Sequence, residues 1–280
     1  MRIGFHISIA GGLRNVAPRA QKLKCSTIQL FSRSPRSWLL KTLDKQDVHD
    51  FKTMLKKSAI SPVFVHTPYL LNLASCDPLL FKKSVNALVV DLRRSNEMGV
   101  PYVIMHCGSA ENAAQGIRMM AKGINSALNR AQNGVVLLLE NTAGGGNELG
   151  YQFDQLADII ARVKQTKRIG VVLDTAHLFA AGYDLRTSKS TDAMLQGFDS
   201  IVGFDKLHLV HLNDSKTACG SRSDRHWHIG KGKIGKGLAH VVNHPLLQHL
   251  PFIMETPRKS DKDDLRNMRA AKRLLQLKAM

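Results

Sequence analysis

The amino-acid sequence predicts an α/β fold, a single (β/α)8 barrel of the TIM type. The chain has 280 residues, and such barrels commonly form one domain of about 250 residues. Short β-rich apolar runs alternate with longer segments of helical pattern, as expected for βαβ units around a parallel sheet. The sequence contains no long linker or low-complexity tract that would divide it. We therefore expect one domain over residues 1–280.

Eight apolar runs predict the strands of the barrel. In chain order they lie near residues 3–9, 27–31, 62–65, 102–105, 135–139, 171–173, 207–210 and 252–254. Between the strands, apolar residues at helical spacing predict helices that cover the barrel. Two such series are Phe81, Val85, Leu88, Val89 and Leu92, and Leu265, Met268, Ala271 and Leu275.

The composition excludes several classes of protein. The hydrophobic fraction is 44%, which is ordinary for a globular protein, and no apolar run approaches the ~20 residues that span a bilayer. The N-terminus lacks the features of a secretory signal, so we expect a cytoplasmic protein. Cys25, Cys76, Cys107 and Cys219 are widely separated, which favours neither a disulfide framework nor a thiolate zinc finger.

The chain carries a large positive charge. Its 40 lysine and arginine residues exceed its 22 acidic residues and leave a net charge of +18. Such a charge favours a polyanionic partner, because neutralising phosphates releases condensed counterions. Nucleic acid is the first candidate. The alternative is that the charge reflects a generally basic proteome of the source or an association with ribosomes.

Six of the predicted strands are followed directly by a side chain that can bind a metal ion. Histidine and acidic residues fill 34 of the 280 positions (12 plus 22), so six such residues at eight strand ends exceed what chance would give. A closed barrel brings the carboxyl ends of its strands to one mouth. The six residues are His66, His106, Glu140, Asp174, His211 and Glu255.

These side chains predict a metal centre. A single acid at a strand end more often caps a helix or forms an ion pair. Six buried carboxylates and imidazoles would repel one another unless a cation bound them, and nitrogen with oxygen ligands suits Zn²⁺ or Mn²⁺. His177, Asp224 and His226 lie close by in the sequence. Nine candidates are enough for two or three ions with bridging carboxylates.

The segments that carry these residues resemble the endonuclease IV family of apurinic/apyrimidinic endonucleases over essentially the whole chain. The most specific segment covers residues 209–232, from Leu-Val-His-Leu-Asn-Asp-Ser to Gly-Lys-Gly. It is similar to the family signature around the seventh strand. The supporting segments are residues 6–12, 66–72, 140–144, 174–177 and 254–256.

The resemblance implies a cofactor of three zinc ions, with Mn²⁺ as an alternative at one or more positions. The first ion would be bound by His66, His106 and Glu140, and Glu140 would bridge to a second ion. The implied ligands that complete the second ion are Asp174, His211 and Glu255, and those of the third are His177, Asp224 and His226. All nine positions carry the residue type that the family has.

The resemblance also implies the activity. The enzyme would be a DNA repair hydrolase that cuts the phosphodiester bond 5′ to an abasic site by a trinuclear zinc hydroxide mechanism, with Glu140, Asp174 and Glu255 as catalytic carboxylates. The products would be a 3′-hydroxyl and a 5′-deoxyribose phosphate, and 3′-blocking groups would also be removed. The substrate would be double-stranded DNA. We also expect a monomer, because the sequence shows no obvious exposed apolar surface, and we expect it to associate with the nucleoid when it is bound to DNA.

Recognition of the lesion needs further side chains, because metal ions do not distinguish one phosphate from another. The resemblance points to Arg36, Tyr69 and Leu70 as residues that enter the duplex. Arg222 and Arg225 lie in the signature loop, where they could hold the DNA backbone. The alternatives are a surface arginine, packing at the barrel rim and ordinary solvated charges.

Two other functions compete with this interpretation. A sugar isomerase or epimerase could use the same fold with a divalent metal at its mouth. The third metal triad and the charge of +18 argue against it. A non-catalytic nucleic-acid-binding protein could keep zinc for stability, but structural zinc sites are usually closed by four protein ligands.

Overall fold

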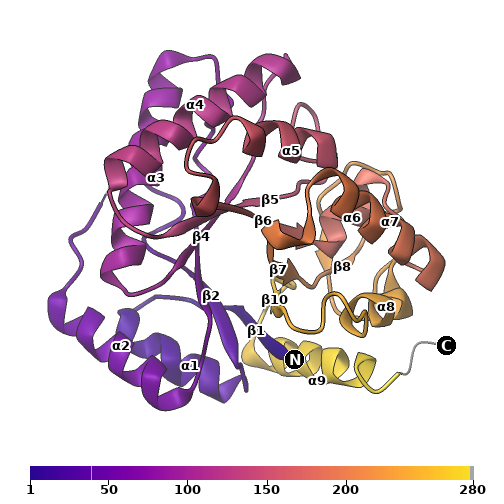
Figure 1. Ribbon diagram of the computed structural model, residues 1–280. Coiled ribbons are helices and arrows are strands. Elements are labelled where there is room, and N and C mark those ends of the chain that lie inside the picture. Colours follow the sequence, from indigo (N-terminus) through magenta and orange to yellow (C-terminus); the bar gives the residue numbers. More distant parts are fainter. Residues whose placement is uncertain (39, 278–280) are drawn as a thin grey trace.

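A computed structural model describes residues 1–38 and 40–277 of the chain. Its centre is a closed barrel of eight parallel strands in the order β1-β10-β7-β6-β5-β4-β3-β2, surrounded by helices (Figure 1). The strands are β1 (Arg2–His6), β2 (Thr27–Phe31), β3 (Val63–His66), β4 (Tyr102–His106), β5 (Val136–Glu140), β6 (Ile169–Asp174), β7 (Leu207–His211) and β10 (Pro251–Met254). The predicted TIM barrel and its eight strands are confirmed.

Six predicted strands end elsewhere in the structure: β1 ends three residues early, and β3, β4, β5, β6 and β7 each end one residue later than predicted. Strand β1 ends at His6, three residues before the predicted end at Ile9. Gly11 and Gly12 follow with φ of 78° and 112°, and they turn the chain into a short 3-10 helix, so extended pairing stops early. The apolar run of β3 predicts an end at Val65, but the pairing of Phe31 with His66 extends the strand by one residue.

Helices connect the strands, as the apolar spacing predicts. The side chains of Asp44, Asp77 and Asn112 accept hydrogen bonds from the first turns of α2, α3 and α4, which fixes where these helices begin. The helices are α1 (Val16–Lys22), α2 (Lys45–Ser58), α3 (Pro78–Glu97), α4 (Ala113–Ala131), α5 (Phe153–Ala161), α6 (Thr175–Ala181), α7 (Ser188–Ile201), α8 (Leu238–Val242) and α9 (Asp261–Leu274). The apolar series at 81–92 lies in α3, and the series at 265–275 lies in α9 and its C-cap residue.

Shorter elements lie between the helices and strands. After β7, the strands β8 (Asp214–Ser215) and β9 (His226–Trp227) form a two-stranded antiparallel sheet outside the barrel. The 3-10 helices are η1 (Leu13–Asn15), η2 (Thr166–Arg168), η3 (Phe204–Lys206) and η4 (Gly235–Gly237). Within the described part of the chain, no helix combines the length and the apolar character that crossing a membrane requires.

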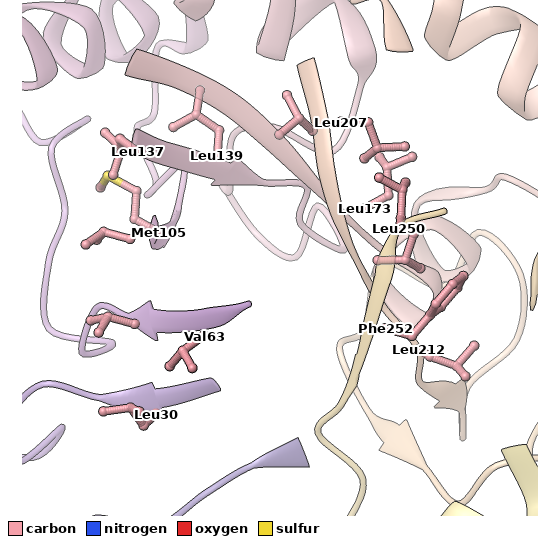
Figure 2. Close-up of a cluster of buried hydrophobic side chains, with 14 of the residues drawn as sticks. Leu30, Val63, Met105, Leu137, Leu139, Leu173, Leu207, Leu212, Leu250 and Phe252 are labelled. Carbon is pink, nitrogen blue, oxygen red and sulfur yellow. The ribbon is translucent and has the colours of Figure 1, made fainter. Parts of the chain in front are cut away.

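The barrel strands separate two apolar cores. The larger core lies between the strands and the helices, and Figure 2 shows part of it, including Leu30, Met105 and Phe252. The smaller core fills the inside of the barrel. Its six buried members, one from each of six strands, are Phe64, Ile104, Leu138, Val172, Leu209 and Ile253.

The inner core forms the floor of the candidate site. Side chains alternate between the two faces of a strand, so the residue two positions further on also points into the barrel. Each of the six inner residues is followed at that spacing by one of the six predicted ligands, from Phe64 and His66 to Ile253 and Glu255. In the two remaining strands, His6 of β1 is paired with Gln29 of β2. The apolar floor therefore carries a polar layer built from all eight strands.

Gly4 lies below this layer in β1, and a larger residue cannot replace it without moving the strand. A Cβ atom at Gly4 would lie 1.7 Å from the backbone oxygen of Thr27 in β2. We predict that Gly4→Ala lowers the free energy of unfolding by about 2–3 kcal/mol or more, because overpacking against the backbone cannot relax by rotation of a side chain. Urea unfolding followed by circular dichroism measures this change.

Gly134→Ala is the matched control, because a Cβ atom there has no neighbour within 4 Å. We expect its free energy of unfolding to stay within about 1 kcal/mol of the wild type. Equal stabilities of the two variants would contradict the close approach of β1 and β2.

Candidate metal centre

The six predicted strand-end ligands meet at the carboxyl end of the barrel, together with His177 and His226. Their nitrogen and oxygen atoms form three groups in which all atoms lie within 4.8 Å of one another. The prediction that these side chains converge at one mouth is confirmed. The groups are His66, His106 and Glu140; Glu140, Asp174, His211 and Glu255; and Asp174, His177 and His226.

The first group surrounds one oxygen of Glu140. Nε2 of His66 lies 3.0 Å from Oε2 of Glu140, and Nε2 of His106 lies 3.4 Å from the same oxygen. Nδ1 of His66 is 2.7 Å from the carbonyl oxygen of Thr67 and donates to it, so Nε2 is the nitrogen that faces the group. These three residues leave room for a further ligand on an ion.

The second group surrounds Nδ1 of His211. That nitrogen lies 2.9 Å from Oε1 of Glu140, 3.3 Å from Oε2 of Glu255 and 3.9 Å from Oδ2 of Asp174. Glu140 thus directs one oxygen to the first group and the other to the second. The side chains of Glu140, Asp174 and His211 are fully buried.

The third group depends on elements outside the barrel strands. Asp174 caps α6, since its Oδ1 accepts from the backbone N–H of His177, and this places the His177 ring over the mouth. Strand β9 brings His226 to the same place, with Nε2 3.2 Å from Nε2 of His177. Asp224 contacts both rings, at 3.3 Å from His177 and 3.4 Å from His226.

Asp174 lies between the second and third groups. Its Oδ2 is 3.6 Å from Nε2 of His226 and 3.9 Å from Nδ1 of His211. The family resemblance assigns Asp174 to the second ion and Asp224 to the third. The geometry keeps Asp224 beside the third group and adds Asp174 as a carboxylate that can reach both.

Mutual attraction shifts the pKa values of the buried groups. Burial opposes ionisation of Glu140, but His211 and His106 outweigh it and hold the pKa of Glu140 well below its usual range. Burial also opposes the charge on His211, yet Glu140 and Glu255 raise its pKa to about 9. In Asp224, burial is outweighed by His177, which lowers the pKa to about 2. Glu140 and Asp224 are therefore held in the ionised form that binds metal.

The arrangement of the third group fits a bound cation. Nδ1 of His177 donates to the carbonyl of Asn141 at 2.9 Å, and Nδ1 of His226 donates to the carbonyl of Glu255 at 3.2 Å. Nε2 of each ring then faces the other across 3.2 Å, beside the carboxylates of Asp174 and Asp224. A metal ion held between these two nitrogens and the two carboxylates could be bound by all four groups. The nitrogen and oxygen donors suit zinc or manganese.

Three amide side chains that the sequence did not single out organise the centre. Gln29 lies in the polar layer and bonds to Glu255 and His211. Asn141 accepts from the backbone N–H of Asp174 at 2.7 Å, and Asn213 donates to Oδ2 of Asp174 at 2.6 Å. No sequence signal marked Gln29, because it lies two residues before the end of β2, whereas the predicted ligands follow their apolar runs directly.

The residues expected to contact DNA lie in different surroundings. Tyr69 is 74% exposed at the mouth. Together with Leu70 it lines a cavity of about 310 Å³ that reaches His66 and His106. Arg225 borders a second cavity, of about 300 Å³, at the metal centre.

The other two arginines stand apart from these cavities. The guanidinium of Arg222 packs over the ring of Tyr151, 4.5 Å from its centroid. Arg36 is exposed. His6, outside all three groups, lies 3.6 Å from Oε1 of Glu255.

Comparisons with known proteins agree with this architecture. The family described as xylose isomerase-like TIM barrel matches residues 17–277. A protein of Halothermothrix orenii named "Probable endonuclease 4" is 44% identical over 266 residues, which cover 94% of this chain and 96% of that protein.

Solved structures extend the comparison. The crystal structure of endonuclease IV from Thermus thermophilus has a TM-score of 0.90 and 38% identity, and the match covers 99% of each chain. A D-tagatose 3-epimerase-like protein has a TM-score of 0.76 at 17% identity, covering 99% of this chain and 98% of its own, which shows a shared fold only. The chain therefore belongs to the xylose isomerase-like TIM-barrel proteins and, among them, to the endonuclease IV family.

Proposed function

We propose that this protein is a metal-dependent DNA repair endonuclease that hydrolyses the phosphodiester bond 5′ to an abasic site. The observation that carries the proposal is the set of three ligand groups joined by two carboxylates, since Glu140 belongs to the first two groups and Asp174 to the last two. Relatives named as endonuclease 4 and endonuclease IV support DNA as the substrate.

The proposed cofactor is a cluster of three zinc ions, with manganese as the alternative. His66 and His106 would hold the first ion, and Glu140 would join it to the second. When bound, the ions would activate water near neutral pH and offset the charge of the phosphate. Asp174, His211 and Glu255 would complete the second site, and His177, Asp224 and His226 the third.

The chain's own residues would prepare the reaction in two ways. The apolar floor seals the barrel beneath the centre, so reactants approach only from the mouth. Glu140, with its pKa held low by neighbouring imidazoles, stays ionised and fixes the spacing of the first two sites. The products we expect are a 3′-hydroxyl and a 5′-deoxyribose phosphate, and the same centre would remove 3′-blocking groups.

We assign recognition of the abasic site to side chains at the rim of the barrel mouth. An abasic nucleotide has no base to unstack, so it leaves the helix more easily than an intact nucleotide does. Tyr69 and Leu70 offer apolar surface beside the cavity next to the centre, which suits filling the gap in the duplex. Arg36, Arg222 and Arg225 would contact the backbone of double-stranded DNA, and the net charge of +18 favours that contact. We propose a monomer that acts in the cytoplasm on nucleoid DNA.

The two competing functions are disfavoured by specific features. A sugar epimerase with this fold has no evident need for the third ligand group or for the charge of +18. A purely structural zinc site would be closed by four protein ligands, whereas the first group offers three.

The first test is incision of duplex DNA that contains one tetrahydrofuran abasic analogue, which cannot undergo β-elimination. We expect the zinc-loaded protein to cut 5′ to the analogue and leave a 3′-hydroxyl, and the chelator-stripped protein to cut only after zinc is restored. Gel electrophoresis of end-labelled strands measures both results. A folded, zinc-loaded protein that leaves this duplex intact but epimerises a ketose would refute the proposal.

Glu140→Gln tests the shared carboxylate. We expect kcat/KM for the analogue to fall by about 10³-fold or more, roughly 4 kcal/mol of barrier, because the amide cannot join two ions. Glu111→Gln is the control, since Glu111 is exposed, and it should keep wild-type activity. Undiminished cutting by metal-replete Glu140→Gln would count against the bridging role.

Tyr69→Ala tests recognition of the lesion. We expect binding to abasic duplex to weaken by about 10-fold, the loss of roughly 1–3 kcal/mol of stacking, while the zinc content stays unchanged. Fluorescence anisotropy with lesion-containing and intact duplexes measures the difference. Leu246→Ala removes another exposed apolar side chain and should change neither affinity. Equal effects on both duplexes would show that Tyr69 contributes nothing to selectivity.

A further inference from the structure

Three histidines of the metal centre are held in the same way. In each, Nδ1 lies within hydrogen-bond distance of a main-chain carbonyl oxygen, which can only accept. Nδ1 therefore carries a hydrogen, and Nε2 is the ring nitrogen that faces the centre and that can bind a metal ion. The three pairs are His66 with Thr67 at 2.7 Å, His177 with Asn141 at 2.9 Å, and His226 with Glu255 at 3.2 Å.

His211 is held in the opposite way, and by a side chain. Its Nε2 lies 2.8 Å from Oε1 of Gln29, while its Nδ1 faces the oxygens of Glu140 and Glu255. Gln29 and His211 are both fully buried. Water therefore does not compete for this hydrogen bond. Among these four histidines, only His211 is held by a side-chain acceptor, which a substitution can remove.

The direction of the Gln29 amide follows from Glu255. Nε2 of Gln29 donates to Oε1 of Glu255 at 2.7 Å, and an ionised carboxylate can only accept. The amide oxygen must then face His211, and an amide oxygen can also only accept. Nε2 of His211 consequently carries a hydrogen, which leaves Nδ1 as the ring nitrogen that faces Glu140 and Glu255 and that can bind a metal ion. The amide nitrogen has a second partner in Nδ1 of His6, at 2.9 Å.

We propose that Gln29 is the positioning residue of the second metal site, which makes His211 bind through Nδ1 and fixes the carboxylate of Glu255 beside it. This inference rests on the proposed metal-dependent function. Gln29 is fully buried, and both ends of its amide are already bonded within the protein. It acts through two ligands at once, since one end of its amide bonds to His211 and the other end to Glu255.

Loss of this amide removes two constraints from the second site. The imidazole of His211 becomes free to carry its hydrogen on either nitrogen, and Glu255 loses a donor that holds one of its oxygens. Residues that orient metal ligands in this manner typically change metal affinity by about 10- to 100-fold. The first and third sites keep their main-chain partners and need not change.

Gln29→Met tests the proposal in the full-length protein. Methionine has nearly the same length but neither bonds to His211 nor donates to Glu255. We expect one zinc equivalent to bind about 10- to 100-fold more weakly in competition with a chromophoric chelator, with the remaining equivalents unchanged. On the abasic analogue, kcat should fall more than KM rises, because DNA contacts are intact.

Thr27→Val is the matched control. Thr27 precedes Gln29 on the inward face of β2, is fully buried and bonds through Oγ1 to the carbonyl of Pro62 at 2.6 Å. We expect this variant to bind every zinc equivalent with wild-type affinity. Urea unfolding of both metal-free variants separates a general loss of stability from a local change at the second site.

Nitrogen-15 NMR of histidine-labelled, zinc-loaded protein supplies a readout independent of activity. We expect His211, assigned with His211→Gln, to bind zinc through Nδ1 in the wild type and to lose that signature in Gln29→Met. Binding through Nε2 in the wild type, or unchanged zinc affinity in Gln29→Met, would overturn the inference. A wild-type protein that binds zinc but leaves abasic DNA uncut would instead refute the proposed function, and the zinc measurements would still test Gln29.

Discussion

The attraction between buried carboxylates and the imidazoles around them is the interaction on which this structure depends. Glu140 is fully buried, yet its pKa lies well below the usual range because His211 and His106 face it. Without those rings, burial would favour the neutral acid. The main-chain carbonyls, the cap of α6 and the amides of Asn141 and Asn213 all serve to hold these charged groups at fixed distances.

Much of the barrel and of the ligand set could be predicted from the sequence because both follow simple periods. Strand residues alternate between two faces, and five strands end in a predicted ligand while Glu255 directly follows β10. The predicted ends of β1 and of β3 to β7 were inaccurate because glycine turns and cross-strand pairing, which decide where a strand stops, are not visible in apolar runs.

Other parts of the site depend on the third dimension. Gln29 is one of many amide side chains in the sequence. Its position in the polar layer follows from the offset between neighbouring strands, which pairs Gln29 of β2 with His6 of β1. Asp174 lies between two ligand groups because β9 places His226 beside it, and β9 is too short to be predicted from the sequence. The surroundings of Arg222 depend on Tyr151, which comes from a distant loop.

The apolar floor has a consequence for the lifetime of any ion in the centre. Phe64, Ile104, Leu138, Val172, Leu209 and Ile253 close the barrel beneath the ligands, and all six are fully buried. An ion can then escape only through the mouth, and Tyr69 and Leu70 stand beside that same opening. A long polymer resting on the rim would cover the exit. A polymer bound at the mouth would therefore slow the exchange of ions with solvent. The protein would retain its metal ions best while the polymer is bound.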